Sequence, residues 1–298
     1  MEQKDGQDGD KYDETENGRI TMKNRNFKDI LLCATSMFLL VGCAKSDVAN
    51  GRQDMDLEPF GKIAVCVRED GSGTRETFSE LVVDSDDVCE SAYEAQGNEA
   101  VIAYVANNEN AIGYTSKGTV EHALDIAIVE SDKSIARPFQ MVTIDEWNEV
   151  ESDFMRYVLS EGQTLVSKRY SVAKQPTGFL SDQSKGTITI GGSSSMAQLV
   201  TELADEYMQI NKNATIEIMT TDSKDGINGA LDGRYDLGMI SRELSDYEKQ
   251  LLEPTKIAED EIVLIVNAQN PIRQLDFEEI KDIYQGTYTS WKELKGER

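Results

Sequence analysis

Two short runs rich in glycine and hydroxyl side chains hold the residues with the clearest potential for chemistry. They are Asp70-Gly71-Ser72-Gly73-Thr74 and Gly191-Gly192-Ser193-Ser194-Ser195. Each run follows an apolar segment typical of a buried strand and precedes a segment with helical character. The first N–H groups of a helix have no partner within the helix, and the helix dipole adds partial positive charge there. With hydroxyl donors added, such a turn can bind a small oxyanion.

A second interpretation of these turns needs no ligand, because Ser and Thr are ordinary helix N-caps and glycine also serves close packing. Two such turns in one chain, with no catalytic constellation elsewhere, favour oxyanion binding. Neither turn has the spacing of a Walker A loop or of a G-x-G-x-x-G dinucleotide fingerprint. Nucleotide cofactors are therefore not expected.

The composition excludes several classes of protein. The 298 residues suggest about two domains, and 55 acidic against 30 basic residues give a net charge of −25, which disfavours nucleic-acid binding. The single histidine, His122, argues against most catalytic triads and metal sites, so we expect neither an enzyme nor a metal or cofactor. No C-x-x-C pair is present. Cys66 and Cys89 could form a disulfide outside the cytoplasm, or Cys66 could be a small buried hydrophobe.

The N-terminal segment, residues 1–43, is interpreted as an acidic leader followed by a lipoprotein signal peptide. A basic stretch at 23–28 precedes an apolar run of 13 residues, 30–42. At about 1.5 Å per residue this run is shorter than a bilayer core of ~30 Å. The run and the following Cys43 resemble a lipobox, which implies lipidation of Cys43 and an anchor on the outer face of the cell membrane. An ordinary signal peptide with an incidental cysteine is the alternative, and residues 44–60 are predicted to be a tether.

The rest of the chain alternates between strand and helix patterns, which is typical of α/β layers. A polar segment with turn residues at 175–186 is predicted to be a linker. The expected strands are 62–67, 111–114, 124–129, 187–190, 214–219, 236–240 and 261–266, and the expected helices are 75–82, 100–105, 145–166, 196–209, 226–231 and 277–284.

Three segments, 67–75, 190–197 and 230–242, resemble the signatures of phosphate ABC-transporter substrate-binding proteins. Smaller matches lie at 105–108, 111–114, Arg137-Pro138, 159–163, 262–267, Asn270-Pro271, 277–284 and 290–293, so that the resemblance covers most of residues 62–173 and 187–298. The resemblance implies an α/β, two-lobed periplasmic-binding-protein-like fold of type II, with hinge strands and the ligand in the cleft. It places residues 61–120 with 265–298 in lobe one and residues 121–264 in lobe two.

The order of the segments differs from the family pattern. The segment like 187–298 comes first in that family and the segment like 62–173 follows, whereas here they are exchanged. The chain is either a circular permutant, with residues 175–186 closing the gap, or a piece of a tandem array or swapped assembly. We favour the circularly permuted protein, because permutation is tolerated where the original termini lie close together at the surface.

The resemblance also implies a set of phosphate-binding residues. Ser223 lies in a loop more charged than the family pattern, and Ser241 stands where members carry aspartate or serine, although it could simply cap a strand end. Asp70 is a possible proton acceptor for hydrogen phosphate, or a helix cap. The implied donors are Arg68, Ser72, Gly73 and Thr74 from one lobe and Ser194, Ser195, Ser223 and Ser241 from the other.

The expected function is capture of inorganic phosphate outside the cytoplasm and its delivery to an ABC permease, without chemistry on the anion. Differential affinity for the closed lobes would drive closure. The alternative is an anion sensor or surface interaction module that has the same fold and does not transport.

Overall fold

The computed structural model describes residues 55–83, 88–121, 123–144 and 146–295. The predicted leader, signal peptide and Cys43 lie outside these residues. Of the predicted tether only residues 55–60 are described, and they pack against the fold: Leu57 is fully buried and a 3-10 turn, η1, covers Glu58–Phe60. The predicted tether, 44–60, therefore extends too far, because its last residues already belong to the folded part of the chain.

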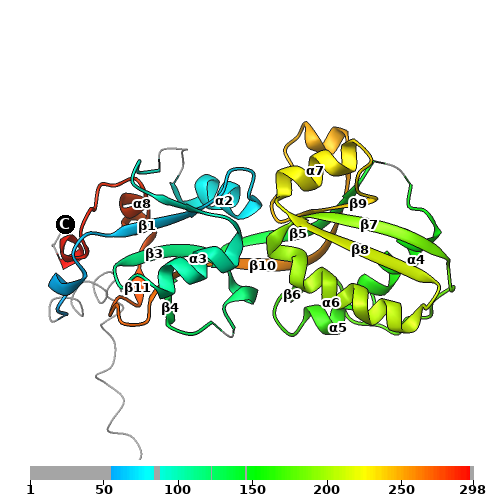
Figure 1. Ribbon diagram of the computed structural model, residues 1–298, viewed down its shortest axis with the longest axis horizontal. Coiled ribbons are helices and arrows are strands. Elements are labelled where there is room, and N and C mark those ends of the chain that lie inside the picture. The colour runs from blue at the N-terminus through cyan, green and yellow to red at the C-terminus, as the bar shows by residue number, and fades with distance from the viewer. Residues whose placement is uncertain (1–54, 84–87, 122, 145, 296–298) are drawn as a thin grey trace, which may run out of the picture. The chain divides into compact units, whose positions relative to one another are not determined.

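Two α/β lobes share one mixed sheet, in the strand order β2-β1-β3-β10-β5-β9-β7-β8 (Figure 1). The expected fold class is thus confirmed. The strands are β1 Ala64–Arg68, β2 Tyr93–Ala95, β3 Ala111–Ser116, β4 Ile126–Ser131, β5 Ile135–Thr143, β6 Ser171–Val172, β7 Gly186–Ser193, β8 Ala214–Thr221, β9 Leu237–Ile240, β10 Glu253–Asn267 and β11 Gln274–Leu275. The helices are α2 Gly73–Phe78, α3 Gly97–Ala106, α4 Glu149–Val158, α5 Gln163–Val166, α6 Ser194–Ile210, α7 Ser223–Leu231 and α8 Phe277–Tyr284, with short turns η2 Ser79–Val83, η3 Lys117–Thr119, η4 Glu248–Gln250 and η5 Trp291–Lys295.

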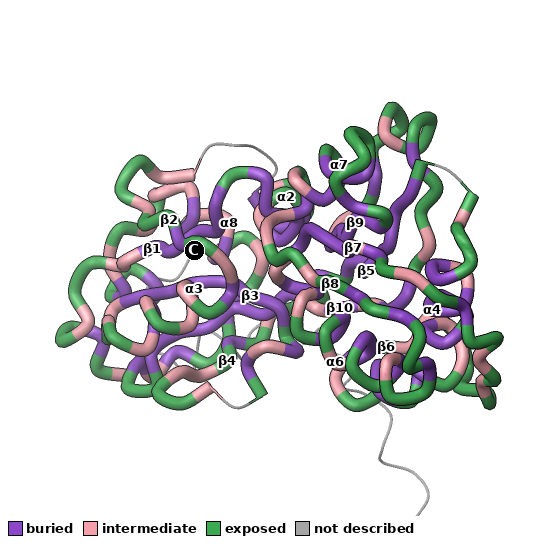
Figure 2. The backbone as a smooth tube through the Cα atoms, turned by 45° about the vertical axis from the view of Figure 1, so that its right-hand side comes forward, coloured by how far each residue is buried: buried purple, intermediate pink, exposed green. Residues whose placement is uncertain are grey.

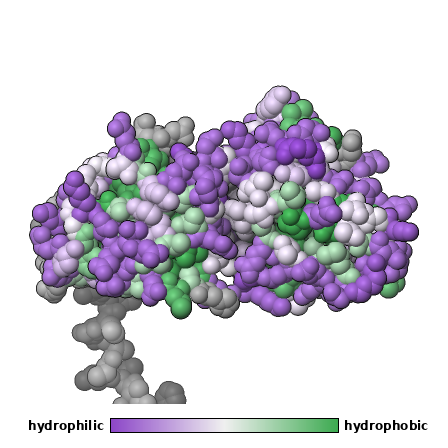
Figure 3. Space-filling view, viewed as in Figure 1, coloured by the Kyte–Doolittle hydropathy of each residue, from purple (hydrophilic) through white to green (hydrophobic). Residues whose placement is uncertain are grey.

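Each lobe has its own hydrophobic core. Lobe one is built from two described segments that are far apart in sequence: β1 and β3 pack with α8 and with Trp291, which is fully buried. In lobe two, α4 and α6 cover β7 and its neighbours, and the apolar face of α6 has the helical spacing expected for burial on a sheet. Figure 2 shows this burial along the central strands, and Figure 3 shows a mainly hydrophilic outer face.

Helix α8 shows how local sequence sets an element. Asp276 accepts a hydrogen bond from the backbone of Glu279, whose side chain in turn accepts from the backbone of Asp276. This capping box fixes the start of the helix. Ile280, Ile283 and Tyr284 are fully buried on one side, so the predicted range 277–284 is confirmed at both ends.

Strands β5 and β10 connect the lobes, running antiparallel from one lobe into the other (Figure 1). Ile135 and Ile262 belong to the core of lobe one, whereas Phe139 and Ala258 belong to the core of lobe two. Neither β5 nor the first part of β10 was expected from the sequence.

The predicted boundary of lobe two, 121–264, is wrong at both ends. Strand β4 pairs with the last part of β10 and with β11, which places it in lobe one. The described residues up to 135, and those from 262, therefore belong to lobe one. Lobe two comprises the described residues of 139–258.

The predicted linker is held against lobe two by a buried carboxylate. Asp153 of α4 is fully buried. It accepts hydrogen bonds from Ser181 Oγ at 2.6 Å, Tyr207 OH at 2.9 Å and the Asp182 backbone N–H at 3.2 Å, and it also pairs with Arg156. Residues 173–185 contain no helix or strand, so these contacts, more than regular structure, fix the path of the linker.

Replacing Asp153 with alanine is expected to lower the free energy of unfolding by about 3 kcal/mol, because the buried hydroxyl of Tyr207 loses its acceptor and the linker loses its hydrogen bonds to α4. Denaturant titration of both proteins measures the difference. Asp205→Ala, at an exposed position on α6, is the matched control and is expected to change stability by less than about 0.5 kcal/mol. Equal stability of the two variants would contradict this account of the linker.

Both described cysteines are free, Cys66 within β1 and Cys89 partly buried. Cys66 is fully buried, and burial raises the pKa of its thiol to about 12. Of the two interpretations of Cys66, the structure supports the small buried hydrophobe.

Candidate anion-binding site

The first of the two glycine-rich turns carries β1 into α2. Arg68 ends the strand and Ser72 is the N-cap of the helix, where its side chain accepts a hydrogen bond from the backbone of Arg75. Gly73 and Thr74 form the first turn of the helix and are buried. The hydroxyl of Ser72 therefore acts as a cap, and that of Thr74 is available to other partners.

The second turn carries β7 into α6, and it meets the first. Thr74 Oγ1 lies 3.0 Å from Ser195 Oγ, although Thr74 belongs to lobe one and Ser195 to lobe two. The Arg68 guanidinium donates to Thr74 Oγ1 at 3.2 Å and to Ser194 Oγ at 3.0 Å. The two predicted helix starts thus converge around one buried cation.

Ser223 and Ser241 join this group from lobe two. Ser241 Oγ accepts from Ser193 Oγ at 2.8 Å and lies 3.3 Å from Ser223 Oγ, which in turn accepts from the Ser241 backbone N–H. A methyl group on Gly73 would lie 2.5 Å from Ser223 Oγ and 2.8 Å from Ser241 Oγ. We call the hydroxyl-bearing residues Thr74, Ser193, Ser194, Ser195, Ser223 and Ser241 the hydroxyl cluster.

Asp70 lies outside this cluster. Its side chain is 84% exposed and forms an ion pair with Lys224 of lobe two, at 3.2 Å. The hydrogen bond and charge of Lys224 lower the pKa of Asp70. The interpretation of Asp70 as a buried proton acceptor is therefore wrong, because the turn at Gly71 leaves its carboxylate at the surface.

The neighbouring residue, Glu69, is the acid that faces inward, and the sequence analysis missed it. Its carboxylate accepts two hydrogen bonds of 2.7 Å from Arg68 and one of 3.0 Å from the Gly97 backbone N–H. Burial alone would raise the pKa of Glu69, but the hydrogen bonds and charge of Arg68 outweigh burial and lower it. Asn98 accepts a further bond from Arg68, at 2.5 Å. The guanidinium is thus rigidly oriented toward the hydroxyl cluster.

Arg137 of β5 was also missed as a site residue. It is buried and donates to Thr74 Oγ1 at 2.6 Å and to Ser241 Oγ at 3.3 Å. Its partner is the buried Asp260 of β10, at 2.9 Å. The match of Arg137-Pro138 to the family signature was the signal for this residue.

A second contact between the lobes surrounds Arg242, which follows β9. Glu248 accepts two hydrogen bonds from Arg242, at 2.7 and 2.8 Å, and these bonds hold the pKa of Glu248 at about 2. The remaining Nε of Arg242 lies 2.5 Å from Glu76 Oε2 on α2, the helix that carries Thr74. This ion pair stabilises the approach of α2 to lobe two.

The substitution Glu76→Gln is expected to speed anion release about two- to fivefold, since a partly exposed ion pair contributes up to ~1 kcal/mol. Glu76 is not among the anion donors, so the association rate is expected to change less. Stopped-flow dissociation measures the effect, with Glu58→Gln as the control for loss of an exposed carboxylate in lobe one. Equal release rates in the two variants would show that this pair does not stabilise closure.

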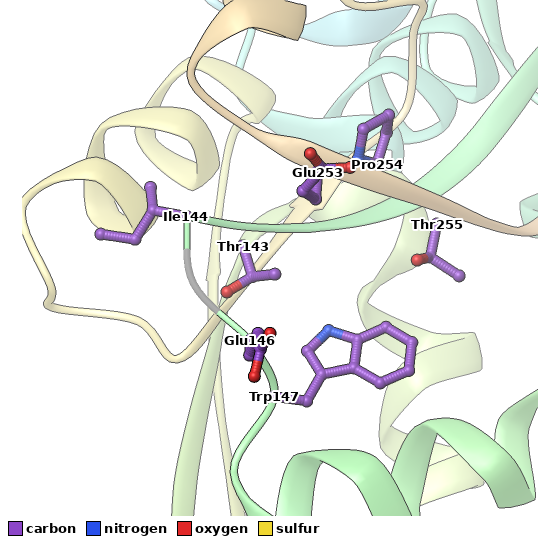
Figure 4. A pocket seen from close by; sticks show the side chains of 7 residues that line it. All are labelled: Thr143, Ile144, Glu146, Trp147, Glu253, Pro254 and Thr255. Atoms are coloured by element: carbon purple, nitrogen blue, oxygen red, sulfur yellow. The ribbon is translucent and has the colours of Figure 1, made fainter.

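A separate open pocket of about 680 Å³ lies in lobe two, where β5 ends and β10 begins (Figure 4). Figure 4 shows the Trp147 indole beneath the strands that carry Thr143 and Thr255. Glu146 and Glu253 also line the pocket. These two carboxylates disfavour an anion there, so the pocket does not compete with the hydroxyl cluster as an anion site.

Groups that could hold a metal are not found among the described residues. In the same part of the chain, no helix is long and apolar enough to cross a bilayer.

A sheet that continues through two lobes, with donors from both lobes meeting beside the connecting strands, defines a two-lobed binding protein. The chain is 32% identical to the phosphate-binding protein PstS 2 of Streptococcus agalactiae serotype V over 280 residues, which cover 86% of this chain and 93% of that protein. PstS 2 of Streptococcus pneumoniae serotype 4 is 30% identical over 296 residues, covering 92% and 100%. The chain belongs to the PstS family of phosphate-binding proteins.

Two further comparisons agree. A PBP superfamily domain model matches residues 177–298. The crystal structure of a phosphate-binding protein of a phosphate ABC transporter from Streptococcus pneumoniae superposes with a TM-score of 0.64 at 31% identity, covering 79% of this chain and 100% of that one.

PstS of Bacillus subtilis aligns differently, with 27% identity over 118 residues, or 39% of each chain. An exchanged order of segments predicts this difference, because a collinear alignment can then include one segment only. The alignments with the streptococcal proteins cover most of both chains, which indicates that they share the order found here. One chain also forms both lobes, as a circular permutant requires.

Proposed function

We propose that this protein captures inorganic phosphate outside the cytoplasmic membrane, between its two lobes, and presents it to the permease subunits of an ABC transporter. The observation that carries the proposal is the convergence of a buried Arg68 guanidinium with hydroxyl groups of both lobes. Charge-assisted hydrogen bonds from the guanidinium and neutral bonds from the hydroxyls suit a tetrahedral oxyanion. The names of the streptococcal relatives support phosphate as that anion.

The ligand set of this proposal is Arg68, Ser72, Gly73 and Thr74 from lobe one with Ser194, Ser195, Ser223 and Ser241 from lobe two. The Ser72 oxygen also caps α2, which holds the helix start in place. The net charge of −25 does not prevent anion binding, since charges farther away than about 8–10 Å are screened at physiological salt. We expect capture to make and break hydrogen bonds only, with no covalent change in the anion.

Calorimetric titration of the purified chain with phosphate and with sulfate tests the proposal. We expect phosphate binding with a Kd in the micromolar range or tighter. No heat with either anion would overturn the proposal. Phosphate binding without phosphate uptake by cells that carry the protein and its permease would indicate the alternative function, an anion sensor that does not transport.

Lipidation of Cys43 is the proposed means of attachment to the outer face of the membrane. Metabolic labelling with a radioactive fatty acid tests it directly. We expect label on the wild-type chain and none on Cys43→Ser, with Cys89→Ser as the control. Equal labelling of the wild-type chain and Cys43→Ser would contradict the lipid anchor.

A further inference from the structure

A buried ion pair sits on the two strands that connect the lobes. Arg137 of β5 and Asp260 of β10 are directly opposite each other in the sheet, and their side chains are 1% and 0% exposed. Asp260 Oδ2 accepts from Arg137 Nη2 at 2.9 Å and from Nε at 3.1 Å, while Oδ1 accepts from Ser116 Oγ at 2.9 Å. Both carboxylate oxygens of Asp260 therefore accept hydrogen bonds.

The third nitrogen of Arg137, Nη1, points away from this pair toward the hydroxyl cluster. It donates to Thr74 Oγ1 at 2.6 Å and to the Ser241 carbonyl oxygen at 3.2 Å. Thr74 Oγ1 also accepts from Arg68 Nη1. Two buried guanidinium groups from different elements therefore reach the same hydroxyl oxygen.

Repulsion between two like charges is strong in a buried environment; Glu69 and Asp260 offset it, and an anion bound between the two guanidinium groups would offset it further. Burial lowers the pKa of Arg137, with a further contribution from the charge of Arg68, although Asp260 opposes both. An ion pair that served only to join β5 and β10 would not need Nη1 directed at residues of both lobes. The arrangement instead resembles that of Arg68, which is held by Glu69 and directed at the same cluster.

We propose that Arg137 is a second cationic ligand of the captured anion and that Asp260 is its positioning residue. This inference rests on the proposed function and extends its ligand set. Two guanidinium groups, each held by its own carboxylate, favour an anion with two negative charges, such as hydrogen phosphate or sulfate, over a singly charged one. Because Arg137 lies on a connecting strand, the bound anion would contact lobe one, lobe two and the hinge at once.

The test measures phosphate and perchlorate binding at pH 8 for the wild type, Arg137→Lys and the double variant Arg137→Gln/Asp260→Asn. The double variant removes both charges together, so that no lone buried charge remains. We expect its Kd for phosphate to rise on the order of 10- to 100-fold, and its preference for phosphate over singly charged perchlorate to fall. The control, Lys256→Gln/Glu259→Gln, removes an exposed pair from the same strand and should bind as the wild type does.

Arg137→Lys separates a ligand role from a merely structural one. Lysine keeps the charge and can pair with Asp260. It lacks the planar guanidinium, whose several N–H groups can donate to Asp260 and to the anion at the same time. We therefore expect near wild-type stability with phosphate binding weakened about tenfold.

The outcomes are distinct. A wild-type chain that binds no phosphate overturns the proposed function. A wild-type chain that binds, with a folded double variant of equal affinity and selectivity, overturns this inference alone. If the double variant does not fold, a crystal structure of the wild type with phosphate decides, and an Arg137 Nη1 farther than about 3.5 Å from every phosphate oxygen would refute the ligand role.

Discussion

Gly73→Ala is expected to weaken phosphate binding about 10- to 100-fold while leaving each lobe folded. The added methyl group would lie 2.5 Å from Ser223 Oγ, 2.8 Å from Ser241 Oγ and 3.0 Å from the Ser241 carbonyl oxygen. These atoms belong to lobe two, whereas Gly73 begins a helix of lobe one. The clash therefore acts against closure of the lobes, and the apparent affinity falls with the population of the closed state.

Calorimetry gives the affinity of the variant, and thermal unfolding reports on its stability. Gly178→Ala is the matched control, because a methyl group there would have no neighbour within 4 Å. It should bind phosphate as tightly as the wild type. Undiminished affinity of Gly73→Ala would mean that Ser223 and Ser241 do not approach α2 in the bound state.

The site could be predicted from the sequence as far as its donors lie in recognisable turns. Hydroxyl groups next to glycine at a strand-to-helix junction have a local physical signature, because the helix start itself provides the donors. Thr74, Ser194 and Ser195 were found in this way, and the structure brings them together. Which of the adjacent acids, Glu69 or Asp70, faces the site could not be predicted. The backbone turn at Gly71, with a φ of +81°, leaves Asp70 exposed at the surface, whereas Glu69 pairs with Arg68.

Strand β5 and the first part of β10 were not predicted, because charged residues and a proline interrupt their apolar pattern. Strand β5 contains Arg137 and Pro138, and β10 contains Glu259, Asp260 and Glu261, a pattern that suggests solvent or a loop. The Arg137–Asp260 pair explains it, since each charge is neutralised by a residue more than a hundred positions away in sequence. The lobe boundary was mispredicted for the same reason, because it depends on where β5 and β10 pair.

Arg68→Gln is expected to cause the largest loss of binding, at least about 100-fold in Kd for phosphate, because charge-assisted hydrogen bonds contribute roughly 1.5–3 kcal/mol each. The guanidinium is 1% exposed, so water cannot replace it. The same change leaves Glu69 without its cation, and the pKa of Glu69 should then rise. The double variant Arg68→Gln/Glu69→Gln removes that lone charge and keeps the test valid if the single variant is unstable.

Arg75→Gln is the control that distinguishes geometry from net charge. Arg75 lies on the same helix start, but its guanidinium pairs with Glu94 at 2.9 Å and is 29% exposed. Both substitutions remove one positive charge within a few residues of Thr74. If anions were attracted by local charge alone, the two variants would weaken binding equally. Because Arg68 directs its donors at Thr74 and Ser194 and Arg75 does not, we expect the Arg75 variant to bind phosphate within about twofold of the wild type.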